Sequence, residues 1–117
     1  MVNPLKTTDP RKRRLIRALD KTKRRFWRNV SEVLQKARSN RVIVNLGKID
    51  VFADDKDTIL IPGKVLSSGD LTHSVTISAF SCSKKAKKKI IKSGAEFILI
   101  EDLLKQNPTG TKIKLVT

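Results

Sequence analysis

The spacing of the apolar residues changes near the middle of the chain, and this change restricts the fold more than any other feature. Between residues 24 and 37, apolar residues recur at helical intervals, which predicts a helix with one buried stripe: Phe26, Val30, Val33, Leu34 and Ala37. After residue 41 the apolar residues form short β-branched runs typical of strands: 42–44, 58–61, 75–80, 97–100 and 112–116. The chain is therefore expected to combine helices with a sheet.

Further helices are predicted from their start and stop signals. One begins at Pro10 and continues to about Lys21, because Asp9 can cap it and proline is favoured at the first helical position. Its apolar edge is thin and consists of Leu15, Ile16 and Leu19. Three shorter helices are expected between strands: 46–53 with Asn45 as its cap, 84–92 between a Ser83 cap and a Gly94 stop, and 101–106 before NPTG.

Short strands interleaved with helices predict an α/β fold with mixed strand directions, behind a basic N-terminal helical segment. A chain of 117 residues with 38% hydrophobic residues fits a single domain with a real core. Within it we expect an extended arm over residues 1–8, a basic helical segment over 9–38 and an α/β core over 41–117.

The charge of the chain is strongly positive and unevenly distributed. Lys and Arg number 26 against 11 Asp and Glu, which gives a net charge of +15. Residues 1–48 carry 15 basic and 3 acidic residues and contain every arginine, whereas residues 49–117 carry 11 and 8. Such a charge on a small domain predicts a polyanionic partner, and arginine provides the planar fork that fits phosphate oxygens. A chromatin-type protein that binds DNA would share this property.

The segment PGKVLSSG, residues 62–69, does not match a nucleotide-binding P-loop. That motif requires a glycine at the position of Thr58 and a serine or threonine at the position of Val65. We expect Pro62 and Gly63 to form a turn after a strand. The hydroxyl and backbone N–H groups of the serines and glycines could then contact a nucleic-acid backbone, with Lys64 as a point charge. Alternatively, the glycines only permit positive φ in tight turns.

Other candidate sites are weaker. Ser67, Ser68, Asp70 and His73 include the residue types of a catalytic triad, but closeness in sequence is not triad geometry. The acidic run 54–57 lacks the ligand spacing of a calcium loop and is expected to be a solvated turn. Trp27 borders the apolar stripe and could either pack there or stack on a base.

The remaining composition argues against metal, disulfide and membrane functions. Cys82 and His73 are the only residues of their types, so neither an internal disulfide nor a zinc cluster of these residues can form, and Cys82 is expected to pack at a strand end. No apolar run approaches the roughly 20 residues of a membrane span. The polar start also lacks the apolar stretch of a signal peptide. We therefore expect a cytoplasmic protein without cofactor, metal or small-molecule substrate.

Three strings, NLGKID, ILIPGKVLSSGDL and GAEFILIEDLLKQNPTGTKIKLV, occur in an order and spacing that resemble the archaeal and eukaryotic large-subunit ribosomal protein eighteen family. That family is related in fold to bacterial large-subunit protein fifteen. The resemblance implies a non-enzymatic component of the large ribosomal subunit with an α/β core of short β-β-α units behind helices. Because the chain ends at KLVT without a long basic extension, an archaeal source is the expectation.

The resemblance also implies partners, namely ribosomal RNA of the large subunit and neighbouring ribosomal proteins. Residues 63–69 occupy the signature loop of the family, and residues 84–92 add a second cationic helix. Together with the charge pattern, this predicts RNA contacts by Lys6, Arg11, Lys12, Arg13, Arg14, Arg17, Lys21, Lys23, Arg24, Arg25, Arg28, Arg38, Arg41, Lys48, Gly63, Lys64, Ser67, Ser68, Gly69, Lys84, Lys85 and Lys88.

Overall fold

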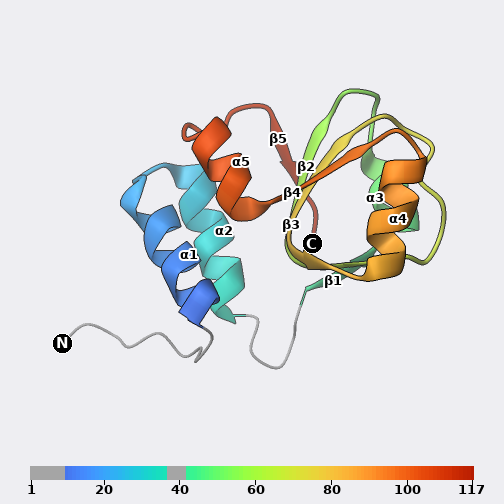
Figure 1. Cartoon of the computed structure of the whole chain (residues 1–117). Helices are drawn as coiled ribbons and strands as arrows, with labels where there is room; N and C mark the ends of the chain where they lie inside the picture. The colour runs from blue at the N-terminus through green and yellow to red at the C-terminus, as the bar shows by residue number, and fades with distance from the viewer. Residues whose placement is uncertain (1–9, 37–41) are drawn as a thin grey trace.

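The structure is a computed structural model that describes residues 10–36 and 42–117. Helices and strands alternate along most of the chain (Figure 1). The elements are α1 (Pro10–Lys21), α2 (Arg25–Lys36), β1 (Ile43–Asn45), α3 (Leu46–Phe52), β2 (Thr58–Leu66), β3 (Thr76–Cys82), α4 (Lys84–Lys92), β4 (Glu96–Leu99), α5 (Ile100–Gln106) and β5 (Ile113–Leu115). The α/β class and the N-terminal helical segment are confirmed.

The strands form one sheet around β2. On one side of β2 lie β3 and then β4, while β1 and β5 share its other edge. β5 pairs with Thr58–Leu60 and β1 pairs with Lys64–Leu66. Each of these pairings is parallel, which corrects the expected mixture of strand directions. The physical reason is that the strands are connected by crossovers, through α3, α4, α5 or the long segment 67–75, and not by tight hairpins.

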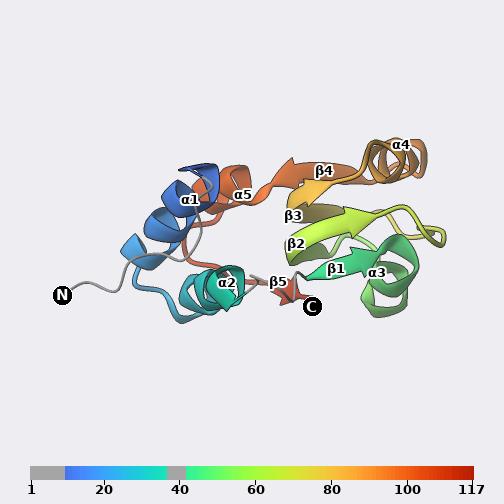
Figure 2. The same ribbon diagram turned by 90° about the horizontal axis from the view of Figure 1, so that it is seen from below.

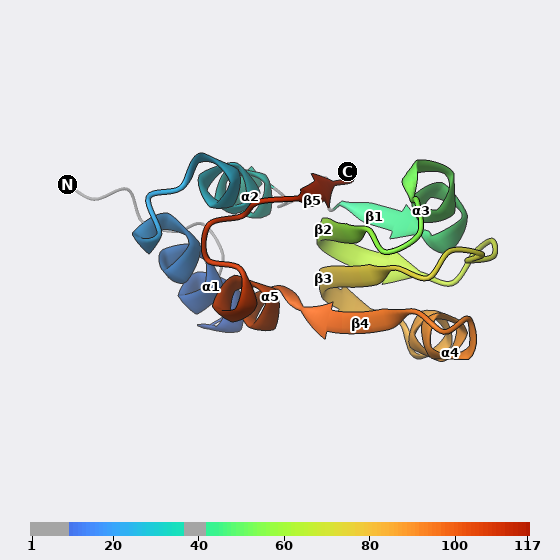
Figure 3. The same cartoon turned by 90° about the horizontal axis from the view of Figure 1, so that it is seen from above.

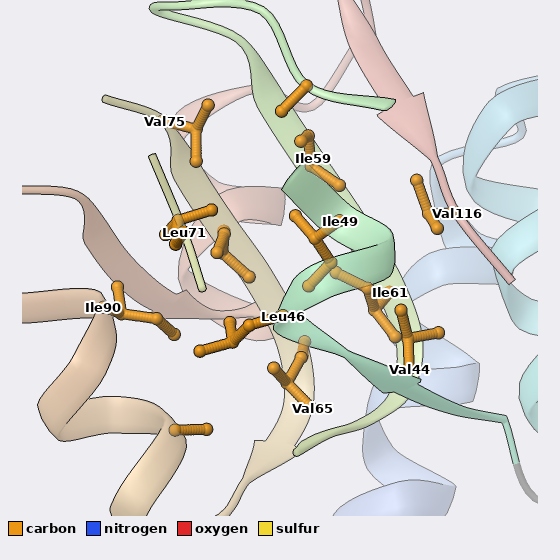
Figure 4. Close-up of a cluster of buried hydrophobic side chains, with 14 residues drawn as sticks. Val44, Leu46, Ile49, Ile59, Ile61, Val65, Leu71, Val75, Ile90 and Val116 are labelled. Atoms are coloured by element: carbon orange, nitrogen blue, oxygen red, sulfur yellow. The ribbon is translucent and has the colours of Figure 1, made fainter. Parts of the chain in front are cut away.

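Helices cover both faces of the sheet. Figure 1 shows α1, α2 and α5 on one side and α3 and α4 on the other, and the views from below and above agree (Figures 2 and 3). Successive residues of a strand point to opposite faces, so β2 contributes to both cores. Ile59 and Ile61 pack with α3 and α4 (Figure 4), whereas Leu60 packs with α1, α2 and α5. The basic helices are thus anchored to the sheet by a core of their own.

The two basic helices match their predicted positions closely. α1 has the predicted bounds, and its thin edge of Leu15, Ile16 and Leu19 is buried. In α2, Val30 and Leu34 of the stripe are buried and Phe26 and Val33 are half-buried, while Ala37 lies outside the described residues.

Trp27 belongs to the core. Its side chain is fully buried, its ring meets that of Phe26 edge-on at 5.0 Å, and its Nε1 donates a hydrogen bond of 3.2 Å to the carbonyl oxygen of Asn107. The packing interpretation is therefore correct and the base-stacking alternative is not.

Strand β2 is longer than predicted, because Pro62 and Gly63 do not form a turn. They lie in a bulge within the strand, where the register with β3 shifts between Ile61 and Lys64. A bulge accommodates a proline without an N–H group and still lets the strand continue. The segment PGKVL is therefore a strand, and only residues 67–69 of the signature segment belong to a loop.

The helix signals in the second half are only partly correct. Ser83 caps α4 by accepting a hydrogen bond from the N–H of Ala86, and Gly94 follows the helix with φ of 85°. Asn45 occupies the N-cap position of α3, but its side chain makes no capping hydrogen bond. The carbonyl oxygen of Ser68 instead accepts from the N–H of Gly47, at 2.9 Å.

Candidate nucleic-acid interface

The first cationic region lies on α1, α2 and the residues between them. Helical spacing turns the apolar edge of each helix toward the sheet, so the basic residues of the other side remain at the surface. We call these exposed residues the N-terminal cationic surface: Arg13, Arg14, Arg17, Lys21, Lys23, Arg24, Arg25 and Arg28. Their RNA contacts stay a prediction. Lys6, Arg38 and Arg41 were also predicted to bind RNA but lie outside the described residues.

Arg11 differs from the exposed arginines of α1 and α2 because its half-buried guanidinium is paired within the protein. Nε lies 2.7 Å from Oε2 of Glu101 and Nη2 lies 3.0 Å from Oε1. The same group is stacked 4.0 Å from the ring centre of Phe80. Lys12 beside it is half-buried. Arg11 therefore joins α1 to α5 and β3.

The second region forms where three parallel strands end at the same edge of the sheet. Asn45, the last residue of β1, pairs with Leu66, and Val65 pairs with Cys82. The residues that follow these strands are consequently brought together: 46–48 at the start of α3, the loop 67–69, and 83–85 at the start of α4. In parallel α/β sheets, ligands commonly bind outside the carboxyl ends of the strands.

Helix α4 begins at this edge and carries six lysines. Ala86 and Ile90 are fully buried, as predicted, and anchor the helix on the sheet. We call four of its exposed lysines the α4 cationic surface, and within the described part of the chain no hydrogen bond or ion pair occurs for any of them: Lys84, Lys85, Lys88 and Lys92. Lys64 of β2 is also exposed, whereas Nζ of Lys48 donates a hydrogen bond of 2.7 Å to the carbonyl oxygen of Thr117.

The loop 67–69 is fixed between α3 and α4. Besides the bond from Gly47 to the carbonyl of Ser68, Nζ of Lys89 donates to the carbonyl oxygens of Ser67 at 2.8 Å and Gly69 at 3.0 Å. Lys89 was missed by the sequence analysis. No local signal marks it among six lysines in nine residues, because its contacts lie about twenty positions away in the sequence.

Both glycines of the signature segment have structural roles. Gly69 adopts φ of 86°, and a Cβ atom there would lie 2.6 Å from Cα of Gly47. Gly63 is required for a different reason than the predicted positive φ, since its Cβ would lie 2.0 Å from the carbonyl oxygen of Val42. Close packing of backbone therefore accounts for Gly63, whereas Gly69 combines close packing with the positive φ of the alternative interpretation. Any RNA contact by these glycines stays a prediction.

Within the described residues, no hydrogen bond joins His73 to the other candidate triad residues, Ser67, Ser68 and Asp70. Nδ1 of His73 lies 2.7 Å from Oδ1 of Asp50, and Asp50 also accepts two hydrogen bonds from Thr72, one from its N–H and one from its hydroxyl. The bond from the backbone of Thr72 lowers the pKa of Asp50, and the bond to Asp50 raises the pKa of His73. His73 is thus held at the end of α3, in an ion pair that stabilises local structure.

The acidic run is a turn that is bound to β5. Nζ of Lys114 lies 2.6 Å from Oδ2 of Asp57 and 3.3 Å from Oδ2 of Asp54. The bond from Lys114 lowers the pKa of Asp57 and raises that of Lys114. Burial raises the pKa of the half-buried Cys82 thiol, which favours its unreactive form.

Two further observations concern residues 10–36 and 42–117. Among them, no three His, Cys, Asp or Glu side chains are grouped as metal ligands would be. No helix in these ranges combines the length and the apolar composition needed to cross a membrane.

Comparison with known proteins gives a consistent result. The family model described as ribosomal protein 60S L18 and 50S L18e matches residues 6–117. A protein of Picrophilus torridus named large ribosomal subunit protein eL18 is 45% identical over 91 residues, which are 78% of this chain and 75% of the relative. Proteins of the same name align over 97% of both chains in Pyrobaculum aerophilum and over 99% of both in Methanothermobacter thermautotrophicus, each at 36% identity. The chain therefore belongs to the family of ribosomal proteins 60S L18 and 50S L18e.

Proposed function

We propose that the protein is a structural, non-enzymatic constituent of the large ribosomal subunit in the cytoplasm of an archaeon. In that particle it binds folded ribosomal RNA and contacts neighbouring ribosomal proteins. The observation that carries the proposal is the placement of its cations. The N-terminal cationic surface and the α4 cationic surface lie on helices packed against opposite faces of one sheet (Figure 1).

This placement suits folded RNA, in which phosphates of different strands are crowded together. A rigid domain with cations on two sides can lie between such strands and offset their repulsion, and it releases counterions as it binds. If about ten phosphates are neutralised, the logarithm of the binding constant should fall with the logarithm of salt concentration at a slope of roughly −9 for duplex or −7 for single-stranded RNA.

Recognition is expected to depend on RNA shape and backbone more than on bases. The chain has no tyrosine, and Trp27, its one tryptophan, is fully buried. Of the four phenylalanines, all within the described residues, only Phe52 is exposed. Base stacking on aromatic side chains is therefore limited to that residue, and contacts to phosphate and ribose are the main source of affinity.

Charge reversal with a matched control tests the proposal. Arg13, Arg14 and Arg17 are exposed on α1, so their joint substitution by Glu should leave the fold intact and prevent incorporation into the large subunit. The control replaces Lys56, Lys105 and Lys112 by Glu. These lysines are exposed outside both cationic surfaces, and the control changes the net charge by the same amount as the α1 variant.

The control variant should assemble, because the proposal assigns the effect to the position of the charges and not to their sum. Normal assembly of the α1 variant would remove the N-terminal surface from the proposal. A second experiment lets duplex DNA and folded large-subunit RNA compete for the protein at physiological salt. A preference for the DNA would favour a chromatin-type protein.

A further inference from the structure

We propose that Lys89 is a positioning residue for RNA binding, which holds the loop 67–69 so that its amide and hydroxyl groups face an RNA phosphate. The inference rests on the proposed function and deepens it. It assigns to Lys89 a role that differs from that of the exposed lysines beside it on α4, which would contact phosphates directly.

The first step concerns the carbonyl oxygens of the loop. All three are used within the protein: Lys89 binds those of Ser67 and Gly69, at 2.8 and 3.0 Å, and the N–H of Gly47 binds that of Ser68 at 2.9 Å. A carbonyl oxygen repels a phosphate when it points toward it. Lys89 and Gly47 therefore remove the part of the loop that would oppose an anion.

The second step concerns the opposite sides of the same peptide groups. The peptide bonds are trans, so each N–H points away from the carbonyl of the preceding residue. Within the described residues, no acceptor occurs for the N–H groups of Ser68, Gly69 and Asp70. The N–H groups of Ser68 and Asp70 oppose the two carbonyls that share Nζ of Lys89, so both point away from Lys89 and can approach the same anion.

The third step concerns the surroundings of the loop. Lys85 lies one helical turn before Lys89 on the same side of α4, and Lys88 is adjacent to Lys89 in the sequence. These exposed lysines would bind the same RNA backbone as the loop. Asp70 carries the opposite charge at the end of the loop, so Asp70→Asn should strengthen RNA binding, by about two- to fivefold.

The test compares Lys89→Met with Lys85→Met, which change the net charge equally on one face of α4. Both are titrated with large-subunit ribosomal RNA from Methanothermobacter thermautotrophicus at several salt concentrations. Lys85→Met should reduce the salt slope by about 0.7 to 0.9, because one phosphate contact is lost. Lys89→Met should weaken binding about tenfold with an unchanged slope, because it disorders the loop without removing a phosphate contact.

Rescue and hydrogen exchange separate positioning from a loss of stability. Lys89→Arg keeps a cationic donor for both carbonyls and should bind within about twofold of the unsubstituted protein. In the RNA complex, amides 68–70 should be protected from exchange in the unsubstituted protein and in Lys85→Met, but not in Lys89→Met. If Lys89→Met does not fold, Lys89→Ala, which also removes the donor and favours the helix, takes its place with the same expected results.

The inference is wrong if Lys89→Met lowers the salt slope as Lys85→Met does, since Lys89 would then itself contact phosphate. It is also wrong if Lys89→Met binds like the unsubstituted protein, or if amides 68–70 stay unprotected in the complex. Failure of the unsubstituted protein to bind this RNA would instead contradict the proposed function.

Discussion

Arg11 in the first turn of α1 and Glu101 in the first turn of α5 form a two-pronged ion pair, with N···O distances of 2.7 and 3.0 Å. The two residues are ninety positions apart in the sequence, and Phe80 of β3 lies under the guanidinium. The basic helical segment is therefore fastened to the C-terminal part of the core by an arginine that composition alone would assign to RNA.

Arg11→Ala should consequently lower the free energy of unfolding by about 1–2 kcal/mol, since it removes a paired guanidinium and its contact with an aromatic ring. Arg13→Ala is the matched control, because Arg13 is exposed on the same helix, and its effect on unfolding should stay within about 0.5 kcal/mol. Urea unfolding of both variants measures the difference. Equal stability of the two would show that the ion pair does not contribute.

Gly69→Ala and Gly94→Ala separate backbone strain from close packing. The two glycines have φ of 86° and 85°, so an alanine should cost about 1 kcal/mol at either position from strain alone. Only at Gly69 does the added Cβ meet backbone, 2.6 Å from Cα of Gly47, whereas at Gly94 no atom lies within 4 Å. Gly69→Ala should therefore lose a further 1–3 kcal/mol in thermal or urea unfolding. Similar losses for both would contradict the close approach of the loop to α3.

The ion pair of Asp50 and His73 predicts a dependence of stability on pH. The folded-state pKa of His73 is raised above 6.5, so its contribution is complete below pH 6.5 and is lost as the pH rises through the raised value. The pKa of Asp50 is lowered below 3.8, so its contribution is present above pH 3.8 and is lost as the pH falls through the lowered value. Between pH 3.8 and pH 6.5 the contributions of Asp50 and His73 to stability are therefore both present.

His73→Gln should remove the loss of stability above pH 6.5, because glutamine does not titrate. Unfolding midpoints measured from pH 5 to 9 for both proteins test this. A midpoint of the unsubstituted protein that does not fall relative to that of His73→Gln over this range would contradict the geometry.

Leu34→Ala should destabilise the protein by about 2–5 kcal/mol, because Leu34 is 2% exposed in the core beneath the basic helices. Glu32→Ala, two residues earlier on the exposed side of α2, should change stability by less than about 0.5 kcal/mol. Calorimetric or urea unfolding compares them. Equal melting of the two variants would mean that α2 is not held by its apolar stripe.

The sequence was sufficient to predict elements whose signals are local. The edge of α1 follows from the spacing of Leu15, Ile16 and Leu19, and the start of α4 follows from Ser83, whose side chain reaches an N–H only three residues away. The burial of Ala86 follows from the same periodicity.

Features that depend on distant segments could not be predicted in this way. Pro62 and Gly63 normally end a strand, but here Val42, the residue before β1, packs against Gly63 and accepts a hydrogen bond from the N–H of Lys64, so the strand continues through a bulge. Asn45 has the residue type of a cap, yet Ser68 supplies the hydrogen bond. The roles of Arg11 and Lys89 are likewise determined by partners that the fold brings near. The distribution of charge in the sequence predicts which segments are cationic. It does not predict which of their cations, such as Arg11 and Lys89, bond to other parts of the protein.

Sucrose-gradient sedimentation of cell lysate tests the central claim most directly, which is that fixed cations on two sides of the domain bind folded ribosomal RNA. The protein should sediment with the large ribosomal subunit at low salt and should leave it only when the salt concentration is high, as expected for many phosphate contacts. Sedimentation as a free protein at low salt, or together with chromosomal DNA, would contradict the account.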